Sequence, residues 1–149
     1  MTGSLKRPST VIDRPTVAAP TLRRPLHEGF PVKDAEVSLK FYTEVLGMQV
    51  LPRPNIGPGY WVGSADRRVE FHIIETNEQY IPGADAQPAA QARHTAWLVD
   101  SLADLRRHLD SLGVPYRETR GRVGADQVFI VDPDGHTWEF QEPSALYPE

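Results

Sequence analysis

The sequence predicts an α+β fold in which two βαβββ modules in tandem form a curled, eight-stranded mixed sheet with the helices on its outer side. Three observations predict it. The second half of the chain repeats the first, each half has the pattern of one strand, one helix and three strands, and 149 residues suffice for one domain. We expect the domain at 26–142, with modules at 26–76 and 93–141 and a tail at 143–149.

The repeat is clearest at four positions. His27 and His94 are 67 residues apart, and so are His72 and Glu139. Each module therefore carries two of these residues, 45 positions apart. A shared spacing of this kind indicates an internal duplication, so we expect the two modules to have the same order of strands.

In the first module, the helix is expected to begin after Asp34, a good N-cap residue, and to end at Gly47, which suits a left-handed backbone. An apolar stripe lies between them. The strands that follow are expected at 48–53, 60–63 and 67–74.

In the second module, Ser101 and Asp104 resemble a capping box, and leucines at helical spacing lead to Gly113. The strands that follow are expected at 114–119, 126–131 and 136–141.

Composition excludes several classes of function. There is no cysteine, so any metal must be held by nitrogen and oxygen. The net charge of −4 argues against nucleic acid as a partner, and no apolar run is long enough to cross a membrane. Residues 1–25 carry five basic side chains and four prolines without an apolar period, which predicts a solvated arm. This stretch lacks the continuous apolar core that a secretory signal needs, so we expect a cytoplasmic protein.

The residues of the repeat are of types that bind divalent metals, and strand phase gives them a common face. Alternate residues of a strand face opposite sides of the sheet. Phe30, Trp97 and Trp138 should pack under the helices, which leaves the four candidates on the other face. If the sheets curl into one trough, these side chains converge as a metal site: His27, His72, His94 and Glu139. The remaining histidines, His108 and His136, are out of place for such a site.

The chain resembles the vicinal oxygen chelate superfamily, which includes glyoxalase I, methylmalonyl-CoA epimerase, extradiol dioxygenases and fosfomycin-resistance thiol transferases. The resemblance covers residues 26–142 and is carried by the first strand and helix, by VEFHIIE, by RHTAWLVD, and by DPDG with a glutamate four residues after its glycine. It implies the same four ligands on the first and last strands of each module. Many members have Glu or Gln at the position of His72, so this histidine also permits an acid–base role.

The resemblance implies an enzyme that binds a small molecule through two adjacent oxygens on a divalent metal. A nitrogen-rich ligand set favours Fe2+, Mn2+, Ni2+, Co2+ or Zn2+. The first interpretation is a glyoxalase- or epimerase-like lyase or isomerase, with Glu139 or His72 as the catalytic base. Trp61, Phe129 and Arg53 are expected to contact substrate, and we expect a homodimer.

Other interpretations remain open. An extradiol dioxygenase would use His27, His94 and Glu139 as its Fe2+ ligands, but such enzymes usually carry a tyrosine where this chain has Phe129. A non-catalytic binding protein, like the bleomycin-sequestering members, generally lacks the ligand set. A thiol transferase normally has a potassium loop, which we do not find in this sequence.

Overall fold

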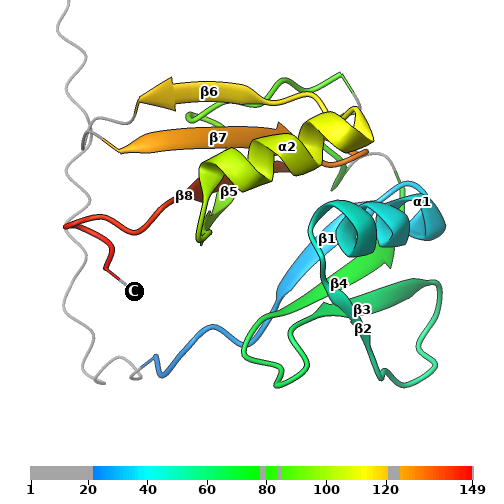
Figure 1. Ribbon diagram of the computed structural model, residues 1–149. Helices are drawn as coiled ribbons and strands as arrows, with labels where there is room; N and C mark the ends of the chain where they lie inside the picture. Colours follow the sequence, from blue (N-terminus) through cyan, green and yellow to red (C-terminus); the bar gives the residue numbers. More distant parts are fainter. Residues whose placement is uncertain (1–21, 78–79, 84, 121–124, 149) are drawn as a thin grey trace, which may run out of the picture.

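The computed structural model describes residues 22–77, 80–83, 85–120 and 125–148 (Figure 1). Most of the arm predicted at 1–25 lies outside them. The first module consists of β1 (Glu28–Val32), α1 (Ala35–Lys40), a π-helical turn η1 (Phe41–Val45), β2 (Gln49–Leu51), β3 (Gly59–Gly63) and β4 (Glu70–Glu75). The second consists of β5 (His94–Leu98), α2 (Leu102–Leu112), β6 (Arg117–Arg120), β7 (Asp126–Val131) and β8 (Thr137–Gln141).

Both modules have the same sheet topology, and the predicted fold class is confirmed. The strand orders are β1-β4-β3-β2 and β5-β8-β7-β6. In each sheet the first strand runs parallel to the last, while the other neighbours are antiparallel. The eight strands divide into two four-stranded sheets, and no ladder between described strands joins one sheet to the other.

The helix boundaries follow the predicted capping residues. The side chain of Asp34 accepts hydrogen bonds from the first turn of α1, and that of Ser101 accepts one from the backbone N–H of Asp104, at 3.1 Å. Gly47 and Gly113 adopt φ of 66° and 67°, the left-handed conformation that glycine tolerates best. All four predictions are confirmed, because each depends only on neighbours in sequence.

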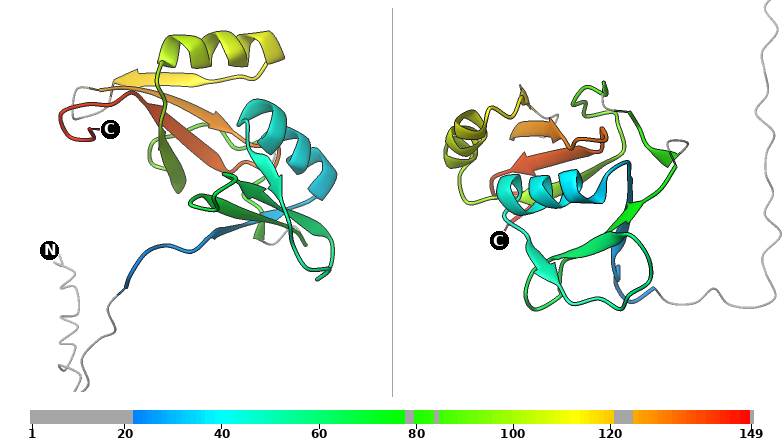
Figure 2. Two further views of the ribbon diagram at one scale, coloured as in Figure 1. Left: turned by 60° about the horizontal axis from the view of Figure 1, so that its bottom comes forward. Right: turned by 90° about the vertical axis from the view of Figure 1, so that its right-hand side faces the viewer.

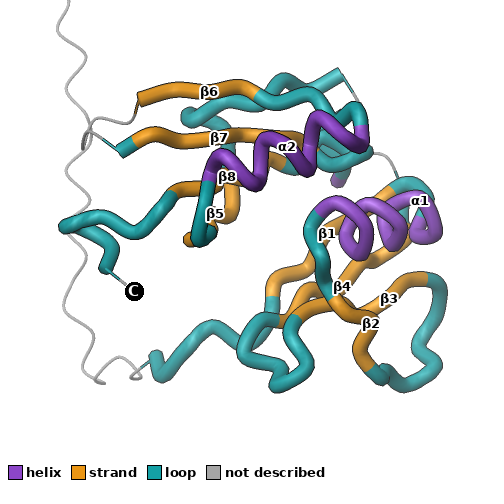
Figure 3. Tube along the Cα trace, in the orientation of Figure 1, coloured by secondary structure: helices purple, strands orange, loops and turns teal. Residues whose placement is uncertain are grey.

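The helix type before Gly47 was not predicted: after Lys40 the α-helix widens into η1. The hydroxyl of Thr43 donates to the carbonyl of Leu39 at 2.9 Å, and the N–H of Leu46 bonds to the carbonyl of Phe41, five residues back. A side-chain donor that competes for a helix carbonyl favours such a local change in pitch. The turn η1, which continues α1, lies against α2. Figure 3 shows α1 and α2 in purple.

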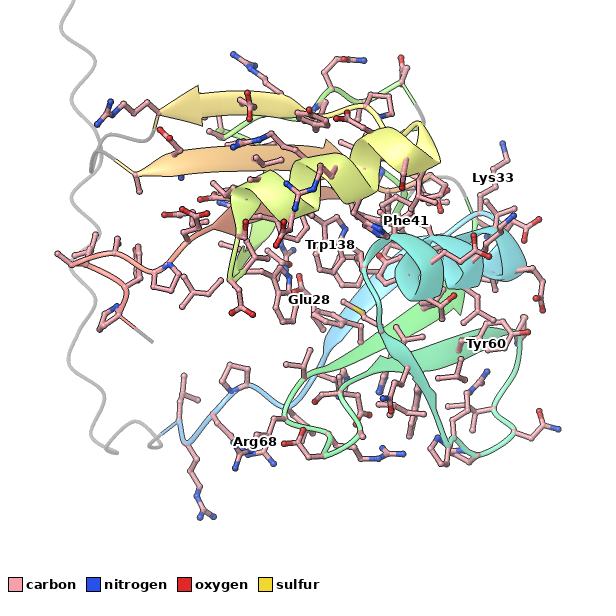
Figure 4. All side chains as sticks on the ribbon, viewed as in Figure 1. Glu28, Lys33, Phe41, Tyr60, Arg68 and Trp138 are labelled. Carbon is pink, nitrogen blue, oxygen red and sulfur yellow. The ribbon has the colours of Figure 1, made fainter. Side chains whose placement is uncertain are left out.

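One hydrophobic core fills the space between the modules. The ring of Trp138 stacks on Phe30 with centroids 5.3 Å apart and meets Tyr42 edge-on at 5.5 Å. Phe71 contacts Trp97 at 5.7 Å. Figure 4 shows Trp138 between the two modules, and Figure 2 shows the two modules from two further directions. The helix-facing sides of both sheets therefore meet in a common core, and their other faces are turned away from it.

The turn between β7 and β8 fastens the second module to the first. Asp132 accepts a hydrogen bond of 2.9 Å from the hydroxyl of Tyr42, and Asp134 accepts one of 3.2 Å from the backbone N–H of Lys33. Burial raises the pKa of Asp132 above its ordinary value and, with the neighbouring Asp132 charge, raises the pKa of Tyr42. None of the described helices is long and apolar enough to cross a bilayer.

Candidate metal centre

The second module brings His94 and Glu139 together. His94 opens β5, and Glu139 lies on the adjacent parallel strand β8, on the face away from α2. His94 Nε2 is 2.8 Å from Glu139 Oε2, while His94 Nδ1 is 2.8 Å from the carbonyl of Ala92. A carbonyl only accepts, so Nδ1 carries a proton, and Nε2 is the nitrogen that faces the carboxylate.

At 2.8 Å, His94 Nε2 and Glu139 Oε2 are held together either by a proton on the nitrogen or by a cation that both atoms bind. Adjacent ligands of an ion with bonds of about 2.0–2.2 Å lie about 3 Å apart, which fits the Nε2–Oε2 separation of His94 and Glu139. A backbone carbonyl that fixes the tautomer of a ligating histidine is also typical of metal sites.

Glu139 is held rigidly by two neighbouring amides. Its Oε1 atom accepts hydrogen bonds of 2.5 Å from Gln127 Nε2 and from Gln141 Nε2, and only 4% of the residue is exposed. Oε2 takes part in neither of these bonds and is the oxygen that faces His94. Neither glutamine was predicted from sequence, although Gln141 lies two residues after Glu139 in β8 and therefore on the same face of the strand.

The first module brings His27 and His72 together, in a different geometry. His27 lies just before β1 and His72 lies in β4. Their rings stack with centroids 3.8 Å apart and planes inclined by 17°. The nitrogen lone pairs of imidazole lie in the ring plane, so two nearly parallel, stacked rings cannot both point at one ion in this arrangement.

A carboxylate missed by the sequence analysis occupies one nitrogen of His72. His72 Nε2 donates to Glu70 Oε1 at 2.8 Å, which leaves Nδ1 as the nitrogen that can accept a proton or bind a metal. This hydrogen bond, with a contribution from the Arg67 charge, lowers the pKa of Glu70. Glu70 and His72 are two residues apart in β4 and therefore share one face of the strand, so their proximity could have been predicted from sequence.

The predicted substrate-contacting residues occupy different settings. Trp61 stacks on the other side of His72 at 4.3 Å and 5°, so that it completes a stack of three rings. Phe129 pairs with Glu139 across β7 and β8 and is fully buried. Arg53 donates through its terminal nitrogens to the carbonyls of Gly57 and Gly59 and braces the loop before β3.

The two pairs do not meet within the described part of the chain, where no group of three or more His, Asp or Glu side chains could hold a metal ion. A cavity of about 910 Å³ opens beside Glu139, and the residues that line it all come from the segment 90–148. They include His94, Ala96, Leu98, Gln127, Gln141 and Tyr147.

The other two histidines make contacts elsewhere. His136 Nε2 lies 2.8 Å from the carbonyl of Pro31, and its ring meets Phe30 edge-on at 5.0 Å. His108 Nε2 lies 3.1 Å from the carbonyl of Val45 on the exposed side of α2.

Comparison with solved structures places this fold among proteins of several functions. A glyoxalase/dioxygenase from Nostoc punctiforme has a TM-score of 0.68 and 20% identity, over 89% of this chain and 100% of that one. Lactoylglutathione lyase from Agrobacterium tumefaciens has a TM-score of 0.59 and 20% identity, over 82% and 96%. TnmS3, an antibiotic binding protein from Streptomyces, has a TM-score of 0.66 and 19% identity, over 85% and 100%. These similarities show the fold alone.

Sequence comparison is more specific. Lactoylglutathione lyase from Schizosaccharomyces pombe is 26% identical, over 83% of this chain and 48% of the relative, so the chain spans about half the length of this curated relative. The model of the Glyoxalase/Bleomycin resistance protein/Dioxygenase superfamily matches residues 24–140. A match over this much of the chain shows that it belongs to that superfamily.

Proposed function

We propose that the protein is a metal-dependent, glyoxalase-like lyase or isomerase that moves a proton next to a carbonyl of a small molecule. The observation that carries this proposal is the pair of His94 and Glu139. A fixed tautomer and two amide donors direct one nitrogen and one oxygen toward a shared point. The similarity to a lactoylglutathione lyase supports the same class of reaction.

The donor set fits a transition metal. One carboxylate oxygen and imidazole nitrogens suit Fe2+, Mn2+, Co2+, Ni2+ or Zn2+ better than Mg2+ or Ca2+. His94, Glu139 and His27 would hold the ion. When bound, a divalent ion supplies Lewis-acid polarisation of a carbonyl whose two adjacent oxygens chelate it.

His72 is assigned the proton transfer. Its Nε2–H is donated to Glu70, which leaves Nδ1 as a proton acceptor of fixed orientation. Both oxygens of Glu139 are already engaged, Oε1 by the two glutamines and Oε2 with His94. Trp61 packs flat against His72 and restricts its rotation. The buried Phe129 has no hydroxyl to offer, which weighs against ring cleavage.

The complete site is proposed to form between two subunits. Within one chain the helix-facing sides of the sheets share a core, so the two ligand pairs lie on faces that point away from it. A homodimer in which the first module of one subunit faces the second module of the other unites all four residues.

Mixed dimers test this arrangement. A chain with His27→Ala and His72→Ala is combined with a chain with His94→Ala and Glu139→Ala. In the mixed dimer one site is intact and the other has lost all four residues. We expect metal binding and activity to return to about half of the wild-type level, whereas a site within one chain would give no recovery.

The reaction class is tested with hydroxy-carbonyl and 2-oxo compounds, lactoylglutathione among them, in deuterated water. We expect deuterium at the carbon next to the carbonyl, detected by NMR, in metal-loaded protein only. Oxygen uptake with a catechol under Fe2+, without deuterium exchange, would instead indicate a dioxygenase.

A further inference from the structure

Arg67, in the turn between β3 and β4, contacts both side chains that hold His72. Its Nη1 atom donates to Glu70 Oε2 at 3.0 Å, and its guanidinium lies over the ring of Trp61, 5.6 Å from the ring centroid. Glu70 receives the Nε2–H of His72 on its other oxygen at 2.8 Å, and Trp61 stacks on the same ring at 4.3 Å. One guanidinium therefore acts on the His72 ring by two separate routes.

The guanidinium is itself held in place from a third direction. Its Nη2 atom donates to the carbonyl of Pro52, just after β2, at 2.6 Å. A planar fork with both terminal nitrogens engaged has little freedom to turn. The side chain of Glu70 is only 13% exposed, so its ion pair with Arg67 is screened less by salt than a surface pair is.

The backbone conformation at Arg67 is uncommon for an arginine. Its φ is 55°, and Arg67 is the one residue other than glycine with a positive φ in the described part of the chain. Glycine and asparagine adopt this left-handed conformation at lower cost than a long side chain does. The turn alone therefore does not account for an arginine at this position, whereas the contacts of its guanidinium do.

We infer that Arg67 is a positioning residue for His72. It holds Glu70 in the plane of the imidazole and Trp61 against its face, so that Nδ1 keeps one direction. This inference rests on the proposed function, which assigns proton transfer to His72. Without the guanidinium, Glu70 loses its charged partner and the imidazole gains freedom to rotate and to exchange its proton between the two nitrogens.

Two adjacent arginines provide matched variants. Arg67→Asn removes the guanidinium, and the turn should still fold because asparagine tolerates the left-handed backbone. Arg68→Asn removes the same charge from the same turn, but Arg68 forms its ion pair with the exposed Asp66. Thermal unfolding verifies that both variants are folded.

The tautomer of His72 gives a readout that does not depend on turnover. We measure the 15N shifts of its ring in the full-length, Zn2+-loaded protein at neutral pH. The wild type and Arg68→Asn should show a single tautomer with the proton on Nε2. In Arg67→Asn both tautomers should be populated, so that the two nitrogen shifts move toward each other. Deuterium exchange into lactoylglutathione should slow about 10–100-fold in Arg67→Asn alone, through kcat and not KM.

The outcomes separate this inference from the proposed function. A single tautomer in Arg67→Asn, an equal loss of it in Arg68→Asn, or two tautomers already in the wild type overturns the positioning role. Exchange at the wild-type rate in Arg67→Asn overturns it as well. A wild-type protein with one tautomer that exchanges no deuterium overturns the proposed function instead.

Discussion

The two modules share one topology but complete their pair of site residues in opposite ways. In the second module, Glu139 is buried and fixed by two amide donors. In the first, His27 is exposed and rests on the ring of His72, which is held by Glu70 and Trp61. The two modules thus keep their pairs at equivalent positions but surround them differently, and the proposed function assigns ion binding to the pair of the second module and proton transfer to His72 of the first.

The turns before the last strand of each module also differ: one bonds only within itself, and the other bonds to the opposite module. In the first module, Asp66 accepts hydrogen bonds from Ser64 and Arg68, all within one exposed turn. In the second, Asp132 accepts one from Tyr42, 90 positions earlier in the chain. The turn of the second module therefore fastens it to the first module, whereas the turn of the first module bonds only within itself.

The largest difference between the modules is expected in metal affinity, when one residue of each pair is replaced by alanine. Glu139→Ala should lower metal affinity by more than about 100-fold, because the charged ligand is lost. His72→Ala should keep metal affinity within about tenfold and abolish proton exchange. Calorimetry with Zn2+ or Ni2+ and elemental analysis measure the first effect, and deuterium exchange the second. Full metal occupancy in Glu139→Ala would remove the basis of the site.

A smaller effect is expected from the residues that support each pair. Gln127→Met should lower metal affinity about 10–100-fold, as is usual when a group that orients a ligand is lost. Glu70→Gln should leave metal affinity within a few-fold and reduce the rate of proton exchange. Equal losses of metal affinity in the two variants would argue that both modules bind the ion in the same way.

Two tyrosine hydroxyls allow a buried hydrogen bond between the modules to be compared with an exposed one within the first module. Among the described residues, Tyr42 is the one side-chain donor to the buried Asp132, so Tyr42→Phe should reduce the free energy of unfolding by about 1–3 kcal/mol. Tyr60→Phe removes the hydroxyl that donates to the exposed Glu36, and should change the free energy of unfolding by less than about 0.5 kcal/mol. Urea unfolding measures both. A Tyr42→Phe protein as stable as the wild type would show that the turn does not hold the modules together.

Local features of the fold were predictable from sequence, because they depend on neighbours along the chain. Asp34 and Gly113 mark helix ends through hydrogen bonds and backbone angles within a few residues. Alternation along strands placed Trp97 and Trp138 in the core and Glu139 on the other face.

The remainder depends on contacts between distant segments. Whether the four candidates face each other is decided by how two complete sheets pack, and a single-chain repeat contains no information on that. The roles of Gln127 and Arg53 were missed for a related reason. A glutamine that orients a carboxylate and an arginine that braces a loop have no distinctive spacing, and both become visible only through their partners in space.

The smallest expected effect is on the pH dependence of stability. The turn carboxylates Asp66 and Asp132 should change the free energy of unfolding in opposite directions as pH rises. The Ser64 hydroxyl lowers the pKa of the exposed Asp66, whereas burial raises the pKa of Asp132. Below the ordinary value of about 3.9, Asp66 loses its stabilising effect as pH falls through its lowered pKa. Asp132 behaves in the opposite way: its folded state keeps the proton longer, so stability declines as pH rises from about 3.9 through the raised pKa. NMR titration of the carboxyl carbons should therefore give midpoints on opposite sides of that value, with Asp132 falling to an ordinary midpoint if the modules separate. Equal midpoints in the folded protein would mean that the turn of the second module is as exposed as that of the first.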